Sequence, residues 1–360
     1  MKLEQIALVF FSCFVFSIFT LEKISNKPQI LISFRNNTKK EETLRSLANK
    51  NNIMIGTAVR IEPLQNDSLY RKTIAREFNV ITTENALKFG RLQSKQHLYD
   101  FRDADVIVGF AKKHGLKVRG HTLVWYGALP RWLTKEKWTR DELIEILREH
   151  ITTVVSHFKG RVDIWDVVNE AIFENGFMRK NLWLKIIGPE YIDSAFYWAN
   201  RSDSNAKLFY NDYGGEGSGI KSDSIFALVR KLKKHEVPID GVGLQMHIRP
   251  GKEPKPQDVF YNIKRLSSLG LDVHITEMDV RLSEPVTEEK LLWQASIYKD
   301  MLKVCLSLEN CKALVFWGFT DLYSWIPHHS PGMGEALIFD KRYRPKPAYN
   351  TLIDELSKQK

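Results

Sequence analysis

The sequence predicts one α/β domain of the (β/α)8 barrel class, also called a TIM barrel. Eight short apolar runs rich in β-branched residues recur at regular spacing from Ile53 to Phe319. Segments with helical periodicity lie between them, and no low-complexity or proline-rich stretch interrupts this part of the chain. Apolar runs that do not alternate with polar residues are typical of parallel strands buried on both faces. Eight strand–helix units in succession favour a barrel with one catalytic domain.

Each predicted strand is one apolar run. The eight runs are Ile53–Val59, Phe78–Thr82, Val118–Val124, Val162–Val168, Leu208–Asn211, Gly241–Gln245, Val273–Met278 and Leu314–Phe319. The clearest helical segments are Ala104–His114, Asp141–Phe158, Ser222–His235, Val259–Leu269 and Glu288–Leu306. A doubly wound open sheet is the alternative architecture. The first run continues as Gly56-Thr57-Ala58, without the glycine-rich phosphate turn with which such sheets usually begin.

The N-terminal residues have the pattern of an export segment. Ile6 to Leu21 is a mostly apolar stretch that follows Lys2 and precedes Lys23. It is short for a membrane span and fits the apolar region of a secretory signal. We therefore predict a signal peptide or an uncleaved N-terminal anchor over 1–21, a polar linker over 22–45 and the catalytic domain over 46–358. The protein is expected to be secreted, extracellular or periplasmic, or tethered through its N-terminal segment.

Composition, charge and cysteine count argue against a nucleic-acid-binding protein and against a zinc protein. The chain has 360 residues, of which 43% are hydrophobic and 27% charged, which is an ordinary globular mixture. The net charge is +10, but the basic runs are short, so we expect a basic surface and no nucleic-acid partner. Three cysteines are too few for a four-cysteine zinc site, and no His-Glu-x-x-His motif occurs. We expect a monomer without metal or cofactor.

Polar and aromatic residues cluster where the predicted strands end, which is where barrels place their chemistry. The second run ends in Thr83-Glu84-Asn85, the fourth in Asp166-Val167-Val168-Asn169-Glu170, the fifth in Tyr210-Asn211-Asp212-Tyr213, the sixth in Gln245-Met246-His247 and the seventh in Thr276-Glu277-Met278-Asp279. Carboxylates, amides and aromatic rings together suit a sugar site. Rings need stacking faces, hydroxyls need donors and acceptors, and acetal cleavage needs two carboxyl groups.

Two glutamates are the candidates for that pair of carboxyl groups. Glu170 ends the fourth run and Glu277 lies at the end of the seventh, and these strand ends face each other across a barrel mouth. A strand interior is a poor place for an unpaired carboxylate, which argues against a merely structural role for both.

The motifs, in this order and spacing, resemble glycoside hydrolase family 10, the family of retaining endo-1,4-β-xylanases. The resemblance extends from Gly56 to Tyr349. It implies that Glu170 is the general acid/base and that Asn169 binds the 2-hydroxyl of the sugar being cleaved. It also implies that Glu277 is the nucleophile, oriented and kept ionised by Gln245 and His247. The implied reaction is cleavage of β-1,4-xylosidic bonds within xylan by double displacement.

The same resemblance implies further roles. Glu84, Asn85 and Lys88 would line the non-reducing side of the cleft. The remaining implied substrate-binding or supporting residues are His121, Trp125, Tyr213, Trp317 and Trp325. Cys305 and Cys311 lie where some members have a disulfide, and two cysteines this close in an exported chain can close a small loop.

Departures from the family pattern concern substrate affinity and leave both glutamates intact. Phe89 replaces a Trp, and Tyr126-Gly127-Ala128 replaces His-Ser-Gln, so a sugar hydrogen bond is expected to be lost at Ala128. Two alternatives stay open: a related β-1,4-glycanase with a different or broader substrate, and a barrel that binds polysaccharide without catalysis. Among the histidines, His150 is expected on the surface and His274 is a candidate supporting residue.

Overall fold

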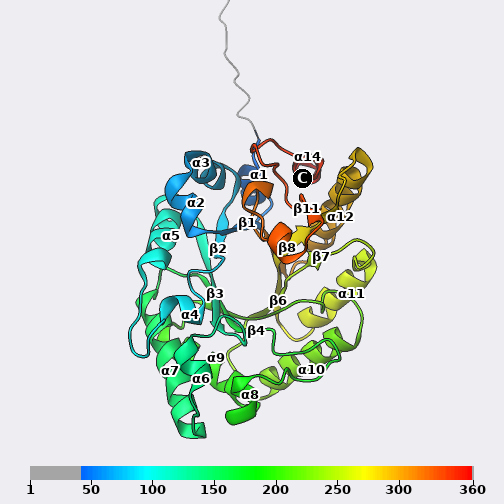
Figure 1. Cartoon of the computed structure of the whole chain (residues 1–360). Helices are drawn as coiled ribbons and strands as arrows, with labels where there is room; N and C mark the ends of the chain where they lie inside the picture. The colour runs from blue at the N-terminus through cyan, green and yellow to red at the C-terminus, as the bar shows by residue number, and fades with distance from the viewer. Residues whose placement is uncertain (1–41, 359–360) are drawn as a thin grey trace, which may run out of the picture. The chain divides into compact units, whose positions relative to one another are not determined.

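The computed structural model describes residues 42–358, which form a closed barrel of eight parallel strands (Figure 1). The barrel strands are β1 (Met54–Val59), β2 (Val80–Thr83), β3 (Lys117–Val124), β4 (Ile164–Asn169), β5 (Lys207–Asp212), β6 (Gly241–Leu244), β8 (Asp272–Val280) and β10 (Cys311–Phe316). Each pairs in parallel with the next, and β10 pairs with both β8 and β1, which closes the sheet. The predicted fold class is confirmed.

Three short strands lie beyond the barrel proper. β7 (His247–Ile248) pairs with the far end of β8, which extends two residues past the predicted run, to Val280. β9 (Leu282–Ser283) and β11 (Met333–Gly334) form a small antiparallel pair. These additions belong to the loops that follow the sixth, seventh and eighth barrel strands, so they build up one rim of the barrel mouth.

Helices surround the strands, as Figure 1 shows for α5, α7, α10, α11 and α12. The longer helices are α3 (Ser68–Glu77), α5 (Arg102–Lys113), α7 (Arg140–His157), α9 (Tyr191–Ser202), α10 (Ile220–Lys234), α11 (Pro256–Ser267), α12 (Glu288–Leu306) and α14 (Pro347–Ser357). The shorter ones are α1 (Leu44–Lys50), α2 (Ile61–Asn66), α4 (Phe89–Leu92), α6 (Arg131–Lys135), α8 (Leu182–Ile186), the 3₁₀ helix η1 (Asp321–Tyr323) and α13 (Ile326–His329).

Local sequence explains where these helices begin. Thr139 caps α7 by accepting from the Glu142 amide, while the Glu142 side chain accepts from the Thr139 amide, a reciprocal capping box. Thr287 caps α12 in the simpler way, through the Lys290 amide. Acidic residues follow both caps and favour the positive end of the helix dipole.

The described chain begins with a helix that belongs to the barrel domain. α1 starts at Leu44 with Thr43 as its cap, and Leu44 and Leu47 are buried in the main core. Thr43 and Leu44 lie within the 22–45 segment that the sequence predicted as linker, and the rest of α1 follows it. The apolar stretch predicted as an export segment lies outside the described residues. Within 42–358, no helix is long and apolar enough to cross a membrane.

Side chains of contrasting size pack between the strands and the surrounding helices, where the Trp165 ring lies 6.3 Å from that of Phe158 at the end of α7. Trp165 is fully buried, and a Cβ atom at Gly120 on the neighbouring strand would lie 2.4 Å from its ring. Glycine is therefore required there for β3 and β4 to pair around the indole.

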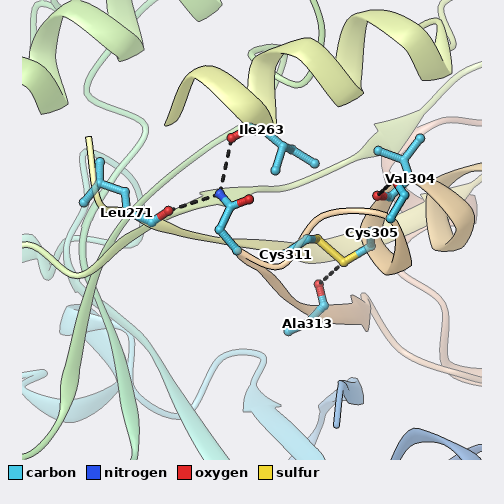
Figure 2. The surroundings of a disulfide bond; sticks show 8 residues. Ile263, Leu271, Val304, Cys305, Cys311 and Ala313 are labelled. Carbon is cyan, nitrogen blue, oxygen red and sulfur yellow. Dashed lines mark hydrogen bonds between the residues drawn. A yellow bond between two sulfur atoms is a disulfide. The ribbon is translucent and has the colours of Figure 1, made fainter. Parts of the chain in front are cut away.

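A disulfide joins Cys305, near the end of α12, to Cys311 at the start of β10, with Cα atoms 5.0 Å apart (Figure 2). The predicted pairing is confirmed. Within the same turn, Asn310 donates from Nδ2 to the carbonyl oxygens of Ile263 and Leu271, at 3.2 and 3.1 Å. These bonds fix the approach to the last barrel strand against α11 and the start of β8.

Candidate active site

A cavity of about 810 Å³ opens where the barrel strands end. It brings together most of the predicted site residues: Lys88, His121, Trp125, Asn169, Glu170, Tyr213, Gln245, His247, Glu277, Trp317 and Trp325. Glu84 and Asn85 do not line the cavity themselves. Asn85 accepts a hydrogen bond from Lys88, which lines it, and Asn85 donates to Glu84. Residues from strands on opposite sides of the barrel thus converge on one cleft, as expected for this fold.

Glu277 is buried in the second half of β8, and side-chain hydrogen-bond donors surround it. The Asn211 amide donates from Nδ2 to Oε1 at 2.6 Å, and His247 Nε2 lies 3.3 Å from Oε2. His247 also binds Asp279 Oδ2 through Nδ1 at 2.9 Å. Burial opposes the charge of His247, but Asp279 and Glu277 raise the pKa of its ring to about 10. The ring is therefore an imidazolium at neutral pH and places a positive charge beside the Glu277 carboxyl group.

Glu170 follows β4 and has different neighbours. Its Oε1 accepts from Gln245 Nε2 at 3.0 Å and from Asn169 Nδ2 at 3.2 Å. The backbone of Glu170 is left-handed, with φ of +58°, an uncommon conformation for a residue with a side chain. Gln245 holds Glu277 through its main-chain oxygen, which accepts from the Glu277 amide at 3.0 Å, whereas its side-chain amide contacts Glu170 and Asn169 rather than the Glu277 carboxyl group.

Asn211 connects the two carboxyl groups, and the sequence analysis did not assign it a role. Its Nδ2 contacts both Glu277 Oε1 and Asn169 Oδ1, the latter at 2.8 Å, and its Oδ1 accepts from Thr276 at 2.7 Å. A Cβ at Gly243 would lie 2.1 Å from that Oδ1, so glycine on the neighbouring strand leaves room for the amide. Asn211 lies at the end of the fifth predicted strand, and this position is the sequence feature that could have identified it as a site residue.

A buried chain of charges supports His121. Its Nδ1 lies 2.9 Å from Asp166, which also binds Arg119 Nε at 3.1 Å. Burial would raise the pKa of Asp166, but Arg119 and His121 outweigh it and the pKa is lowered. His274 contacts Arg119 at 3.0 Å, so it supports the cleft only through these intermediates. The His121 ring in turn meets Trp317 edge-on, with centroids 5.2 Å apart.

A polar chain of three residues follows β2. Lys88 Nζ donates to Asn85 Oδ1 at 2.8 Å, and Asn85 donates to Glu84 at 3.1 Å. Burial raises the pKa of Glu84 to about 7, although nearby Arg60 and Lys88 oppose this. Burial lowers the pKa of Lys88, which Glu277 and Glu84 counteract. The Lys88 ammonium also lies 5.2 Å from the centre of the Trp125 ring. Donors, acceptors and a ring face thus share one side of the cleft.

Two indole rings that follow β10 also line the cleft. Trp325 donates from Nε1 to Asp279 at 2.8 Å, and its ring lies 5.2 Å from that of His247. Trp317 is 7% exposed, and its ring lies edge-on to His247 at 6.2 Å. Both indoles are therefore anchored against the residues that hold Glu277, and they offer flat apolar faces suited to sugar rings.

Arg179 organises the side of the cleft near Glu170, and no sequence pattern marked it. Its Nε donates to the main-chain oxygen of Glu170 at 2.9 Å and its Nη2 to the Tyr213 hydroxyl at 3.0 Å. Tyr213 also donates to Glu174. Its ring covers the buried Lys221 ammonium at 3.6 Å. The ring of Tyr213 is thus held from both sides.

The departure at Phe89 has a packing explanation. The Phe89 ring stacks on His150 with centroids 3.6 Å apart and planes 4° apart. The expectation of a surface position for His150 is wrong, because the ring is fully buried beneath the cleft. Burial lowers the pKa of His150 to about 3, so the ring is neutral and packs as an aromatic group. Among the described residues, no group of three or more His, Cys, Asp or Glu could hold a metal ion.

Comparison with known proteins places the chain in a family. The profile of glycosyl hydrolase family 10 matches residues 43–355. Endo-1,4-beta-xylanase B of Thermotoga neapolitana is 43% identical over 321 residues, 88% of this chain and 92% of that protein. Endo-1,4-beta-xylanase 1 of Humicola insolens is 35% identical over 305 residues, covering 84% and 71%. The crystal structure of xylanase 10B from Thermotoga petrophila RKU-1 with xylobiose superposes with a TM-score of 0.87 at 43% identity, covering 89% of this chain and 98% of that one. The chain belongs to glycosyl hydrolase family 10.

Proposed function

We propose that the protein is an endo-1,4-β-xylanase that cleaves xylan internally with retention of anomeric configuration. Its family is a retaining one, and the relatives compared above carry the name endo-1,4-beta-xylanase. A cleft with carboxyl groups at its centre and aromatic rings and polar groups on both sides suits a polymeric sugar substrate.

In the first step, the Glu277 carboxylate attacks the anomeric carbon and forms a glycosyl ester. The glycosidic carbon–oxygen bond breaks, and the departing oxygen takes its proton from the Glu170 carboxyl group. The His247 imidazolium and the Asn211 amide each contact one oxygen of Glu277 and hold its carboxyl group in position before the attack.

In the second step, Glu170 acts as a base. It removes a proton from water, the water oxygen attacks the anomeric carbon, and the ester bond to Glu277 breaks. Two inversions at one carbon give net retention, and Glu170 ends protonated for the next turnover. The amides of Gln245 and Asn169 hold its carboxyl group through both roles.

The single observation that carries this proposal is the connection between the two carboxyl groups. Glu277 binds the Asn211 amide, that amide binds Asn169, and Asn169 binds Glu170. The two groups are thus joined by only two side chains, yet one contacts an imidazolium, whereas the other contacts two amides and the Tyr126 hydroxyl. Such unequal surroundings suit a nucleophile and an acid/base.

Product analysis tests the substrate and the stereochemistry together. Xylan, carboxymethyl cellulose and mixed-linkage glucan are digested in parallel, and the first products from a xylo-oligosaccharide are followed by proton NMR. We expect xylo-oligosaccharides of several lengths from xylan, little release from the glucans, and the β-anomer first. Comparable release from the glucans identifies a broader β-1,4-glycanase. No release from any substrate identifies a binding barrel.

We further propose that the protein is exported and acts as a monomer. The apolar stretch near the N-terminus, flanked by lysines, supports export. N-terminal sequencing of the exported protein locates a cleavage site in 20–30 or finds the chain intact and tethered. Full-length protein in the cytosol contradicts both versions. Elution at the monomer mass of 41.8 kDa or slightly less supports the second proposal.

A further inference from the structure

A short hairpin stands beside the acid/base candidate. It lies in the loop between β4 and α8, where the Phe173 amide donates to the Phe177 oxygen at 2.8 Å and Ile172 pairs with Met178. Phe177 is 74% exposed and Phe173 is 43% exposed. Two exposed phenylalanines on one turn form an apolar patch, and such a patch beside an active-site cleft is a candidate binding surface.

These rings line a second cavity, of about 960 Å³. Its walls include Tyr126, Phe173, Asn175, Phe177, Lys180 and Leu184. Tyr126 lines this cavity and the active-site cleft as well, so the two spaces adjoin at its ring. A chain that leaves the cleft past Tyr126 therefore enters the second cavity.

Arg179 fixes two of the rings in advance. Its guanidinium carbon lies 4.4 Å from the centre of the Tyr126 ring and 5.1 Å from that of Phe173. Its Nε binds the main-chain oxygen of Glu170 at 2.9 Å. Arg179 thus connects the Tyr126 and Phe173 rings, which form the aromatic wall of this cavity, to the backbone of Glu170. Because these rings are held in place before a ligand arrives, binding costs little conformational entropy.

The position next to Glu170 indicates which end of a substrate reaches the wall. Glu170 delivers its proton to the leaving-group oxygen, so sugars beyond Glu170 and away from Glu277 belong to the leaving group. Sugar rings present C–H faces that stack on aromatic rings, while the Asn175 amide and the Lys180 ammonium can bind hydroxyls.

We propose that the second cavity binds the distal leaving-group end of a long xylan chain, with xylosyl rings stacked on Phe177 and Phe173. This inference rests on the proposed xylanase function and deepens it. It assigns the hairpin a role in favouring long substrates and in setting where a chain is cut.

The test compares a long and a short substrate in Phe177→Ala. The readout is the ratio of kcat/KM for xylohexaose to kcat/KM for an aryl xylobioside, whose leaving group is a single ring. Loss of one stacking contact is expected to lower this ratio about 3- to 10-fold and to shift the cuts in xylohexaose. Phe177→Trp, which keeps a stacking face, is expected to retain most of the ratio.

Tyr261→Ala is the matched control, because Tyr261 is an aromatic residue that is 58% exposed on α11 and lines neither cavity. Its ratio is expected to equal that of the wild type. An unchanged ratio in Phe177→Ala overturns the inference, as does an equal loss on both substrates. A wild type that dimerises while Phe177→Ala is monomeric also overturns it and makes a second copy the occupant. If the wild type hydrolyses neither substrate, the proposed function fails instead.

Discussion

Arg179 donates a hydrogen bond from Nε to the main-chain oxygen of Glu170 at 2.9 Å, and Glu170 is held with φ at +58°. The Glu170 amide donates to Asn211 O at 2.8 Å, and the next amide, of Ala171, donates to the Tyr210 hydroxyl at 3.1 Å. A left-handed backbone at a residue with a side chain costs energy and persists where its surroundings fix it. Arg179 is therefore a positioning residue for Glu170, the proposed acid/base.

Replacing Arg179 should slow steps that need proton delivery to the leaving group. We expect Arg179→Met to lower kcat about 10-fold or more on substrates with poor leaving groups, because a hydrogen bond from a charged donor is lost. The loss should be smaller for a dinitrophenyl xylobioside, which departs without protonation.

Arg179→Lys should recover part of the activity, since an ammonium can still donate to the carbonyl. Arg161→Lys is the control, because Arg161 also covers an aromatic ring but binds Asp105 far from the cleft. Equal losses for good and poor leaving groups would show that Arg179 serves only to hold the loop.

Asn211→Ala should impair the nucleophile. The variant removes the 2.6 Å hydrogen bond to Glu277 and leaves the Thr276 hydroxyl without its acceptor. Loss of a hydrogen bond to a charged group predicts a fall of about 10- to 100-fold in kcat. Pre-steady-state kinetics with a good leaving group should place the loss in the first step. A normal first step with a slow second step would contradict this role.

His247 predicts a specific pH dependence of stability. Its folded pKa of about 10 exceeds the ordinary value of 6.5, so the native state holds a proton that the unfolded state loses between these values. Its contribution to the free energy of unfolding is therefore complete below pH 6.5 and is lost as the pH rises through about 10.

Urea unfolding of wild type and His247→Asn at pH 6, 8 and 10 measures this contribution. The difference in free energy of unfolding should shrink as the pH rises, and wild-type activity should fall over the alkaline part of the same range. A difference that stays constant from pH 6 to 10 would contradict a protonated His247 in the native state.

Cys305→Ala/Cys311→Ala should be less stable and equally active. The disulfide closes a short loop with a sequence separation of 6, which predicts a loss of about 2 kcal/mol, at the low end of the usual range. Neither cysteine lines the cleft, so kcat should not change. Wild type in reducing agent is the control for oxidation state. Equal unfolding midpoints for the two proteins would mean that the bond adds no stability.

The sequence predicted the barrel and the convergence of its strand ends because both follow from local patterns. Buried parallel strands leave continuous apolar runs, and side chains at their carboxyl ends share one rim of the sheet. Glu170 and Glu277 could therefore be paired although they are far apart in the chain.

The finer partnerships could not be predicted because they depend on side-chain direction. Gln245 precedes Met246, whose φ is +66°. At this turn the side-chain amide of Gln245 contacts the Glu170 carboxyl group rather than that of Glu277. The sequence pattern suggested a surface position for His150 on α7, but its ring is buried and stacks on Phe89, a contact between residues far apart in the chain. Arg179 lies in a loop whose sequence carries no periodic pattern, so only the fold reveals its contact with Glu170.

Azide rescue of Glu170→Ala tests the central claim most directly, which is double displacement with Glu277 as nucleophile and Glu170 as acid/base. With a dinitrophenyl xylobioside, the variant should form the glycosyl ester and then stall, because no base activates water. Added azide needs no base and should restore turnover, with β-xylobiosyl azide as the product. Formation of the α-azide, or no effect of azide on a variant that still binds substrate, would contradict the account.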